Sequence, residues 1–400
     1  MLNFYTFISG AGFIPSTRRY EHKRFTIERL HARCNEIRSS EDFQRYMALK
    51  TYVESPEYTS DLEQIKRLTY RGSKEYLMEK RYRQLKKYKE VKAYIKKGEE
   101  NDTSVLREFM SLREEVRSSA FKQRVVYLKN KKKHKQSDPY RCRQEYRQRQ
   151  RSAMIKQYFR LQKKYAAVFS ELERWMVVFE DHFREERLAE HWSTKPFWSI
   201  CQLSGNYVQN AEAHGLDGQN VYVQGGVLHI VTKEAANKGL AWDEKYGFLP
   251  GRFNYTSGVI NTVGHFQTKP KQGKIEIKLR VPSVTNTYHA CWLNCSKITP
   301  AISLFNFCNN KYEAGIYQDE YDDKTCRYMK LIPSHFYIVQ VEWNENHITW
   351  RINGKKITRK PNTIDMPLYL NITSGVIGKV RNAKLPAHLE LDWVKVFETA

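Results

Sequence analysis

Two stretches of this sequence repeat one another, and this repetition restricts the possible folds more than any other feature. Apolar and serine positions of the first stretch recur 63 or 64 residues later in the second. Their spacing of three and four residues is typical of amphipathic helices. We therefore predict two tandem helical repeats, at about 43–97 and 106–160, which stack to bury their apolar faces. The matched pairs include Phe43 and Leu106, Tyr46 and Phe109, Leu49 and Leu112, Val53 and Val116, Ser73 and Ser137, Tyr82 and Tyr146, and Tyr94 and Tyr158.

The surrounding region, 20–174, contains hardly any glycine or proline and is rich in good helix formers. Ser55 stands before Pro56, and Ser137 stands two residues before Pro139, as expected of residues that cap helix starts. We predict an all-α region in which each repeat is a pair of helices with tyrosine and phenylalanine along the seam.

Charge is divided unevenly along the chain. Residues 1–174 carry 42 Lys and Arg against 22 Asp and Glu, whereas 175–400 carry 26 against 22. A basic region of this kind suits nucleic acid, an anionic membrane face or an acidic protein surface, but it also suits a solvated helical stalk. Aromatic residues at helical spacing form stacking platforms for nucleic acid or, more commonly, a core. Nucleic acid is therefore a less favoured partner than other subunits of an assembly.

The remaining global features mostly exclude function classes. The seven cysteines form no CxxC pair, so neither a metal site nor a disulfide framework is indicated, and no cofactor is expected. The segment 1–19 has no basic start and no small-residue cleavage site, which makes a poor secretory signal. No run of about 20 apolar residues predicts a membrane span. We expect a cytoplasmic location or a place in a larger assembly, without assigning a compartment.

From about Trp175 onward the pattern changes to short strands. Lys274 to Val281 alternates between polar and apolar residues, as a half-buried strand does. Gly225-Gly226 and Asn353-Gly354 are turn signals between such segments. Many short strands with turn signals predict an antiparallel sandwich over 175–400.

The strand motifs of this region resemble those of family 16 glycoside hydrolases, the laminarinase-like enzymes with the concanavalin A-like jelly roll. The resemblance implies an all-β jelly-roll sandwich following the all-α repeats. The motifs, in the order of that family, are Phe179-Glu-Asp-His-Phe with Trp192, Tyr255-Thr-Ser-Gly-Val-Ile, Gly273-Lys-Ile-Glu-Ile-Lys-Leu, Tyr288-His-Ala-Cys-Trp-Leu, Ile338 to Gly354, and Leu391-Asp-Trp-Val-Lys-Val-Phe.

The catalytic strand departs from the family pattern. The family reads Glu-Ile-Asp-Ile-x-Glu-Phe, whereas this chain reads Ala-Ile-Ser-Leu-Phe-Asn-Phe. The resemblance thus places Ala301 at the nucleophile position, Ser303 at the assisting acid and Asn306 at the acid/base. A retaining glycosidase needs two carboxyl groups about 5–5.5 Å apart, so the standard mechanism is lost. A displaced carboxylate, from Glu313, Asp319 or Glu320, is the alternative.

What the replaced strand leaves is a cleft that could still hold a sugar. Sugar sites combine aromatic faces with planar polar groups, although large aromatics also dominate cores. The candidate carbohydrate-binding residues are Trp292, His289, Ser303, Asn306, Trp242 and Tyr255.

Three functions follow. The first is a non-catalytic, lectin-like module that binds a polysaccharide and is displayed on a basic helical stalk. The second is a structural or assembly protein that uses the sandwich as a scaffold and the basic repeats to contact partners. The third is a glycosidase with a displaced carboxylate.

Overall fold

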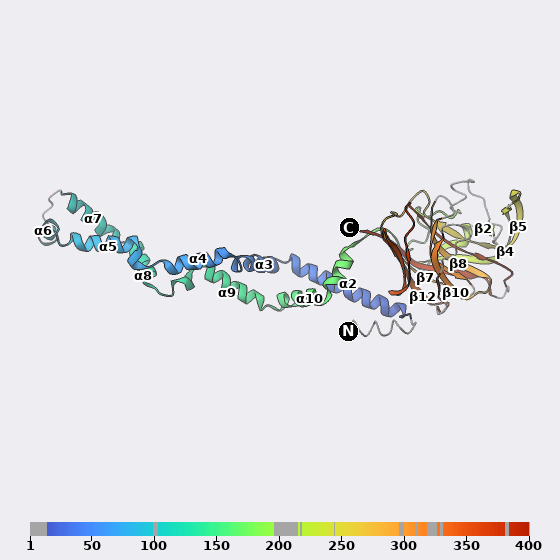
Figure 1. The fold of residues 1–400 in the computed structure, drawn as a ribbon, viewed down its shortest axis with the longest axis horizontal. Coiled ribbons are helices and arrows are strands. Elements are labelled where there is room, and N and C mark those ends of the chain that lie inside the picture. Colours follow the sequence, from blue (N-terminus) through green and yellow to red (C-terminus); the bar gives the residue numbers. More distant parts are fainter. Residues whose placement is uncertain are drawn as a thin grey trace. The chain divides into compact units, whose positions relative to one another are not determined.

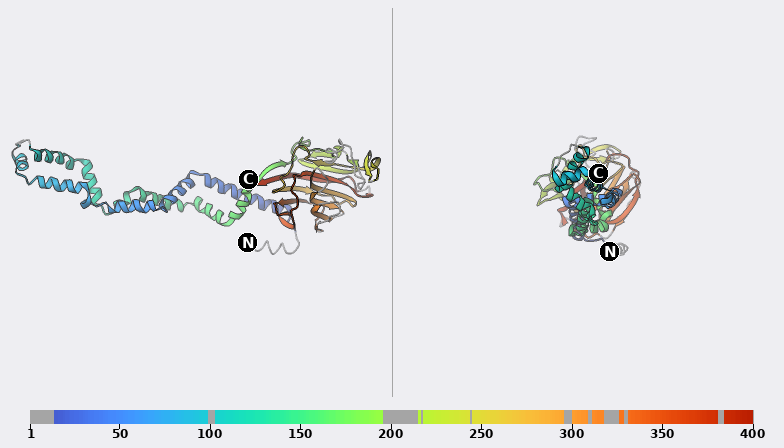
Figure 2. Two further views of the ribbon diagram at one scale, coloured as in Figure 1. Left: turned by 45° about the horizontal axis from the view of Figure 1, so that its top comes forward. Right: turned by 90° about the vertical axis from the view of Figure 1, so that its left-hand side faces the viewer.

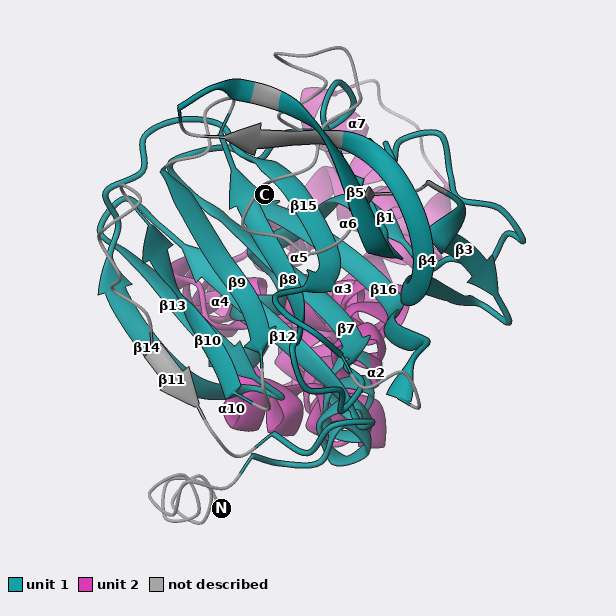
Figure 3. Ribbon diagram, turned by 90° about the vertical axis from the view of Figure 1, so that its right-hand side faces the viewer, with its two compact units in different colours: residues 1–28, 167–400 teal, residues 29–166 magenta. Residues whose placement is uncertain are grey.

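The computed structural model describes residues 14–98, 103–195, 215–216, 218–243, 245–295, 300–308, 311–317, 326–328, 331–380 and 384–399. The chain forms two compact units, coloured separately in Figure 3. We call residues 29–166 the helical unit and residues 1–28 with 167–400 the sandwich unit. The domain ranges expected from the sequence, 1–19, 20–174 and 175–400, stay a prediction.

The two predicted repeats have the same order of elements. Repeat 1 contains α3 (Glu41–Val53), α4 (Pro56–Arg67), the 3-10 turn η1 (Tyr70–Gly72), α5 (Lys74–Leu85) and α6 (Lys89–Lys97). Repeat 2 contains α7 (Ser104–Arg117), α8 (Ser119–Lys129), the 3-10 turn η2 (Lys133–Gln136), α9 (Asp138–Gln150) and α10 (Ala153–Glu173). They follow α2 (Thr17–Ser39).

The prediction of two helices per repeat is wrong, because each repeat is broken into four. Serine caps explain the extra boundaries, since a serine side chain competes for the first free amide of a new helix. Ser55 accepts a hydrogen bond from the Tyr58 amide at 3.3 Å, and its counterpart Ser118 accepts one from the Phe121 amide at 3.1 Å. A capping serine therefore marks a helix start at the equivalent position of each repeat.

Helices of one repeat lie against helices of the other. α3 contacts α9, and α5 contacts α7, so that the chain runs out along one repeat and returns along the second (Figure 1). Tyr46 stacks on Tyr146 with ring centroids 5.4 Å apart, and Tyr82 stacks on Phe109 at 5.2 Å. These aromatic contacts lie between the repeats, whereas the predicted seam lay between the two helices of each repeat.

The sandwich unit consists of two sheets that face one another (Figure 2). Among the described strands, the larger sheet has the order β14-β13-β12-β7-β16-β4-β5-β2, with β1 also paired to β16 and β3 to β4, and the smaller has the order β11-β10-β9-β8-β15-β6. All pairs are antiparallel except β2 with β5. The predicted all-β jelly-roll sandwich is confirmed. The larger sheet comprises β1 (Trp175–Asp181), β2 (Gly215–Leu216), β3 (Val221–Gln224), β4 (Val227–Asp243), β5 (Gly247–Ser257), β7 (Gly273–Arg280), β12 (Phe336–Trp343), β13 (His347–Ile352), β14 (Lys355–Pro361) and β16 (Ala387–Thr399). The smaller sheet comprises β6 (Val259–Asn261), β8 (Thr287–Asn294), β9 (Ala301–Cys308), β10 (Lys311–Tyr317), β11 (Cys326–Tyr328) and β15 (Tyr369–Val376).

Alternating residues of both sheets fill the space between them. In β7, Ile275, Ile277 and Leu279 are buried in this core, because successive side chains of a strand point to opposite faces. Trp350 of β13 is fully buried and its indole N–H donates to the Ser303 carbonyl of β9 at 2.8 Å. This bond joins the two sheets directly through the core.

The first half of α2 belongs to the sandwich unit and contacts the other face of the larger sheet. Arg24 pairs with the buried carboxylate of Glu276, and Glu21 pairs with Lys278 at 2.8 Å. No described helix combines the length and the apolar character needed to cross a membrane.

Candidate functional site

The candidate site is the face of the smaller sheet that points away from the core, which we call the outer face. On β9, Ile302 and Leu304 point into the core, so Ala301 and Ser303 lie on the outer face. Phe305 and Phe307 are also in the core, which places Asn306 on the outer face.

A β-bulge brings these three residues to the same side. Cys291 of β8 pairs with Phe305, but the next residue, Trp292, pairs with Ser303, so that Leu304 is the extra residue. Without the bulge, two positions three residues apart would point to opposite faces of a strand. The local irregularity therefore aligns Asn306 with Ser303.

Neighbouring strands add aromatic and amide groups to the outer face. Trp292 is half-buried, and its ring centroid lies 5.0 Å from that of Tyr317 on β10. Asn371 of β15, the strand that flanks β8 opposite to β9, pairs with Trp292 and lies on the same face. Tyr317 and Asn371 were not predicted from the sequence, although each is a polar or amphipathic residue in an otherwise apolar alternation, which is the signal that could have indicated them.

The floor of the outer face is deeply buried. Ser303 is 0% exposed and Ala301 2%, whereas Asn306 is half-buried. The Ser303 hydroxyl and the Asn371 carbonyl oxygen are buried without a hydrogen-bond partner among the described residues. Such atoms cost about 1–3 kcal/mol each when they stay unpaired, so this face holds polar groups whose bonding capacity is unused.

Carboxylates are scarce on the outer face. In the described strands of the smaller sheet, Glu313 is the one carboxylate, and it lies on β10 opposite Asn306. It is half-buried. Together with burial, its charge raises the pKa of the Cys308 thiol. Asp319 and Glu320 lie outside the described residues.

Two of the predicted binding residues lie elsewhere. His289 is on the core side of β8, where its Nδ1 lies 2.7 Å from the Ser374 hydroxyl and its Nε2 lies 3.3 Å from the Thr287 hydroxyl. Burial lowers the pKa of His289 to about 3, so the ring is neutral in the folded chain. The Tyr255 hydroxyl accepts a hydrogen bond from the Val380 amide, and its ring packs in a separate apolar cluster.

The sixth candidate, Trp242, belongs to β4, where its backbone pairs with Phe248 of β5. Its side chain lies outside what the structure describes. Among the described residues, no group of three His, Cys, Asp or Glu side chains is placed to hold a metal ion.

This geometry is that of an antiparallel sandwich whose outer face carries Ala301, Ser303 and Asn306 on β9, with the carboxylate of Glu313 on β10 opposite Asn306. No family model matches the chain. The Clotting factor G alpha subunit of Tachypleus tridentatus is 21% identical over 254 residues, which are 57% of this chain and 34% of that protein. The chain thus spans about a third of the length of this curated relative.

Solved structures similar to the C-terminal part are glucanases. The endo-β-1,3-glucanase of Pyrococcus furiosus is 18% identical, with a TM-score of 0.47, and the match covers 56% of this chain and 95% of that one. The laminarinase catalytic domain of Thermotoga maritima is 19% identical, with the same TM-score and 99% of its chain covered. The C-terminal part of the chain is similar to laminarinases of glycoside hydrolase family 16, and the resemblance of the motifs is confirmed.

Proposed function

We propose that the sandwich unit binds a polysaccharide on the outer face of the smaller sheet without hydrolysing it. One observation carries this proposal: the aligned residues Ala301, Ser303 and Asn306 contain no acid, while half-buried Trp292 and Asn306 remain on the same face. An alanine can neither attack an anomeric carbon nor donate a proton, and an amide can hydrogen-bond a sugar oxygen but is a poor acid.

The proposed contacts follow from the chemistry of these groups. The ring of Trp292, supported by Tyr317, offers an apolar surface to the C–H face of a sugar ring. The amide of Asn306 offers a donor and an acceptor to sugar hydroxyls. Because the strand motifs are laminarinase-like, a β-1,3-glucan is the first polymer to test.

The test is a calorimetric titration of the full chain with laminarin. We expect binding that falls at least tenfold in Trp292→Ala, which corresponds to about 1.4 kcal/mol. Trp393→Ala is the matched control, since Trp393 is also half-buried but belongs to β16 of the larger sheet. Equal affinities of the two variants would place any binding away from the outer face.

A second candidate is an assembly protein without sugar binding. It is favoured by the complete burial of Ser303 and Ala301, since a covered floor leaves little room for a chain of sugars. It is also favoured by the composition of the helical unit, in which 37 Lys and Arg stand against 18 Asp and Glu. Absence of binding to laminarin, agarose and other neutral polymers would favour this candidate, with other subunits as partners and nucleic acid as the alternative.

A further inference from the structure

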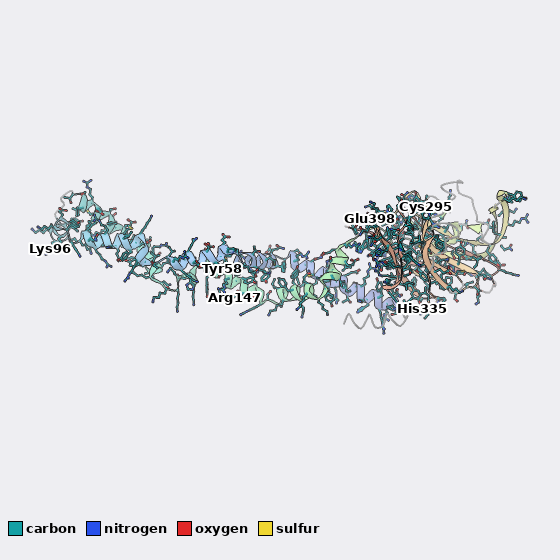
Figure 4. The ribbon with its side chains drawn as sticks, viewed as in Figure 1. Tyr58, Lys96, Arg147, Cys295, His335 and Glu398 are labelled. Atoms are coloured by element: carbon teal, nitrogen blue, oxygen red, sulfur yellow. The ribbon has the colours of Figure 1, made fainter. Side chains whose placement is uncertain are left out.

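The helical unit has an internal two-fold relation that makes it a fused pair of like modules. α3 is equivalent to α7, and α5 is equivalent to α9. The contact of α3 with α9 is therefore the counterpart of the contact of α7 with α5. Figure 4 shows side chains of both repeats, including Tyr58 on α4 and Arg147 on α9.

The stacked rings at the two contacts are alike. Tyr46 on Tyr146 corresponds to Phe109 on Tyr82, because the equivalent positions differ by 63 or 64 residues. These aromatic pairs hold the repeats together. They do not distinguish one repeat from the other, since an aromatic ring stands at each of the four positions.

The ion pairs at the two contacts are reversed. Arg45 of repeat 1 binds Glu145 of repeat 2 through two hydrogen bonds of 3.0 and 2.8 Å. At the equivalent contact, Arg81 of repeat 1 binds Glu108 of repeat 2 through two hydrogen bonds of 2.7 Å. Repeat 1 thus supplies both arginines and repeat 2 both glutamates. Two copies of repeat 1 would bring Arg45 against Arg81, and two copies of repeat 2 would bring Glu108 against Glu145.

A second set of equivalent positions also favours the pairing of unlike repeats over the pairing of like repeats. Asp42 of α3 pairs with Arg149 of α9 at 2.6 Å. The equivalent positions at the other contact are Val105 and Leu85, which lie in one hydrophobic cluster. Pairing of like repeats would place Asp42 against Leu85, or Val105 against Arg149. Each mismatch leaves a charge against an apolar side chain, which is unfavourable.

We propose that the repeats recognise each other as an unlike, charge-coded pair. The surface of each repeat accepts the opposite repeat, from its own chain or by exchange from a second copy, and rejects a repeat of its own kind. The helical unit is therefore a pairing surface that fits only one arrangement of two copies of this chain, in which repeat 1 of each meets repeat 2 of the other.

The test uses three variants of the full chain at low ionic strength. The variant Glu108→Arg/Glu145→Arg has arginine on both repeats, and Arg45→Glu/Arg81→Glu has glutamate on both. In each variant alone, we expect the amide exchange protection of α3 and α7 to fall at least tenfold. Mixed in equal amounts, the two variants can pair only with each other, and light scattering should then show a 1:1 dimer with protection restored.

The variant with all four substitutions is the matched control, because it reverses both pairs without changing the number of charges. We expect it to match the wild-type chain in mass and to regain most of the protection, short of the contribution of the pair that Glu145 also makes with Arg149 at 2.8 Å. Wild-type protection in the two double variants would overturn the proposal. So would equal damage in the fourfold variant, which would show a general effect of substitution, or the absence of a dimer in the mixture.

Discussion

At the scale of single residues, His289 shows how a polar side chain of β8 serves the interior. Its ring lies within hydrogen-bond distance of Ser374, whose hydroxyl also lies 2.8 Å from that of Thr232. Thr232 in turn lies 2.8 Å from the Ser257 hydroxyl. This buried chain of polar groups connects β4, β5, β8 and β15, and burial disfavours the charged form of its imidazole by lowering the pKa of His289.

The burial of His289 predicts a pH dependence of stability. The pKa of His289 falls from 6.5 to about 3 on folding because burial disfavours the charged ring. Between these values the unfolded chain binds the proton more readily, so the free energy of unfolding should fall as the pH is lowered from 6.5 toward 3. Chemical denaturation at several pH values measures this slope. In His289→Gln the contribution should be missing, and an unchanged slope would contradict the account.

At the scale of elements, the first half of α2 packs against the larger sheet. Asn353, in the turn between β13 and β14, donates to the Pro15 carbonyl at 2.8 Å. The adjacent Gly354 has a φ of 77°, and a Cβ there would lie 2.6 Å from the Tyr20 ring. With the Arg24–Glu276 pair, these contacts make the segment part of the sandwich unit.

Loss of the α2 contact should therefore destabilise the sandwich. Arg24→Ala leaves the carboxylate of Glu276, whose side chain is 4% exposed, with Lys274 at 3.5 Å as its one ion-pair partner among the described residues. We expect the free energy of unfolding to fall by about 2 kcal/mol, since breaking a buried pair strands a charge. Arg19→Ala, at an exposed position of the same helix, should change it by less than about 0.5 kcal/mol. Equal effects of the two variants would rule out this role for the pair.

The contact between α3 and α9 should be sensitive to acid. Hydrogen bonding to Arg45, which outweighs burial, lowers the pKa of Glu145 from 4.5 to about 2. The contribution of this carboxylate is complete above pH 4.5 and is lost as the pH falls toward 2. Hydrogen exchange in α3 across this range measures the loss. Arg45→Leu should remove much of the pH dependence, and an unaltered dependence would contradict the assignment.

Elements whose signals are local could be predicted from the sequence, and those fixed by distant contacts could not. The Gly225-Gly226 turn joins β3 to β4, and both glycines have positive φ, as expected of a tight hairpin. The repeats were evident because their spacing is regular. The division of each repeat into four helices was missed, although the serine caps marked it.

The outer face was predicted only in part for the same reason. The motif placed Ala301, Ser303 and Asn306 together, although the strand period alone would separate them, because the family pattern already contains the spacing that the bulge requires. His289 and Trp292 lie three residues apart on β8, so their side chains point to opposite faces of the sheet. Which of the two faces the core is decided by packing against the opposite sheet, and the sequence of one strand does not show this.

At the scale of the whole molecule, the chain joins a basic repeat array to a nearly neutral sandwich. The two units offer different chemistry: arginine-glutamate contacts between repeats in one, and an acid-poor outer face in the other. On the two proposals above, recognition is divided between them, with the sandwich unit binding a glycan and each repeat of the helical unit pairing with the opposite repeat.

The most direct test of the central claim is to incubate the full chain with laminarin oligosaccharides and to follow binding and product formation in the same samples. The account predicts binding with no shortened products. Product formation that is abolished in Glu313→Gln but kept in Trp393→Ala would contradict it, because the carboxylate opposite Asn306 would then be acting as a displaced catalytic group.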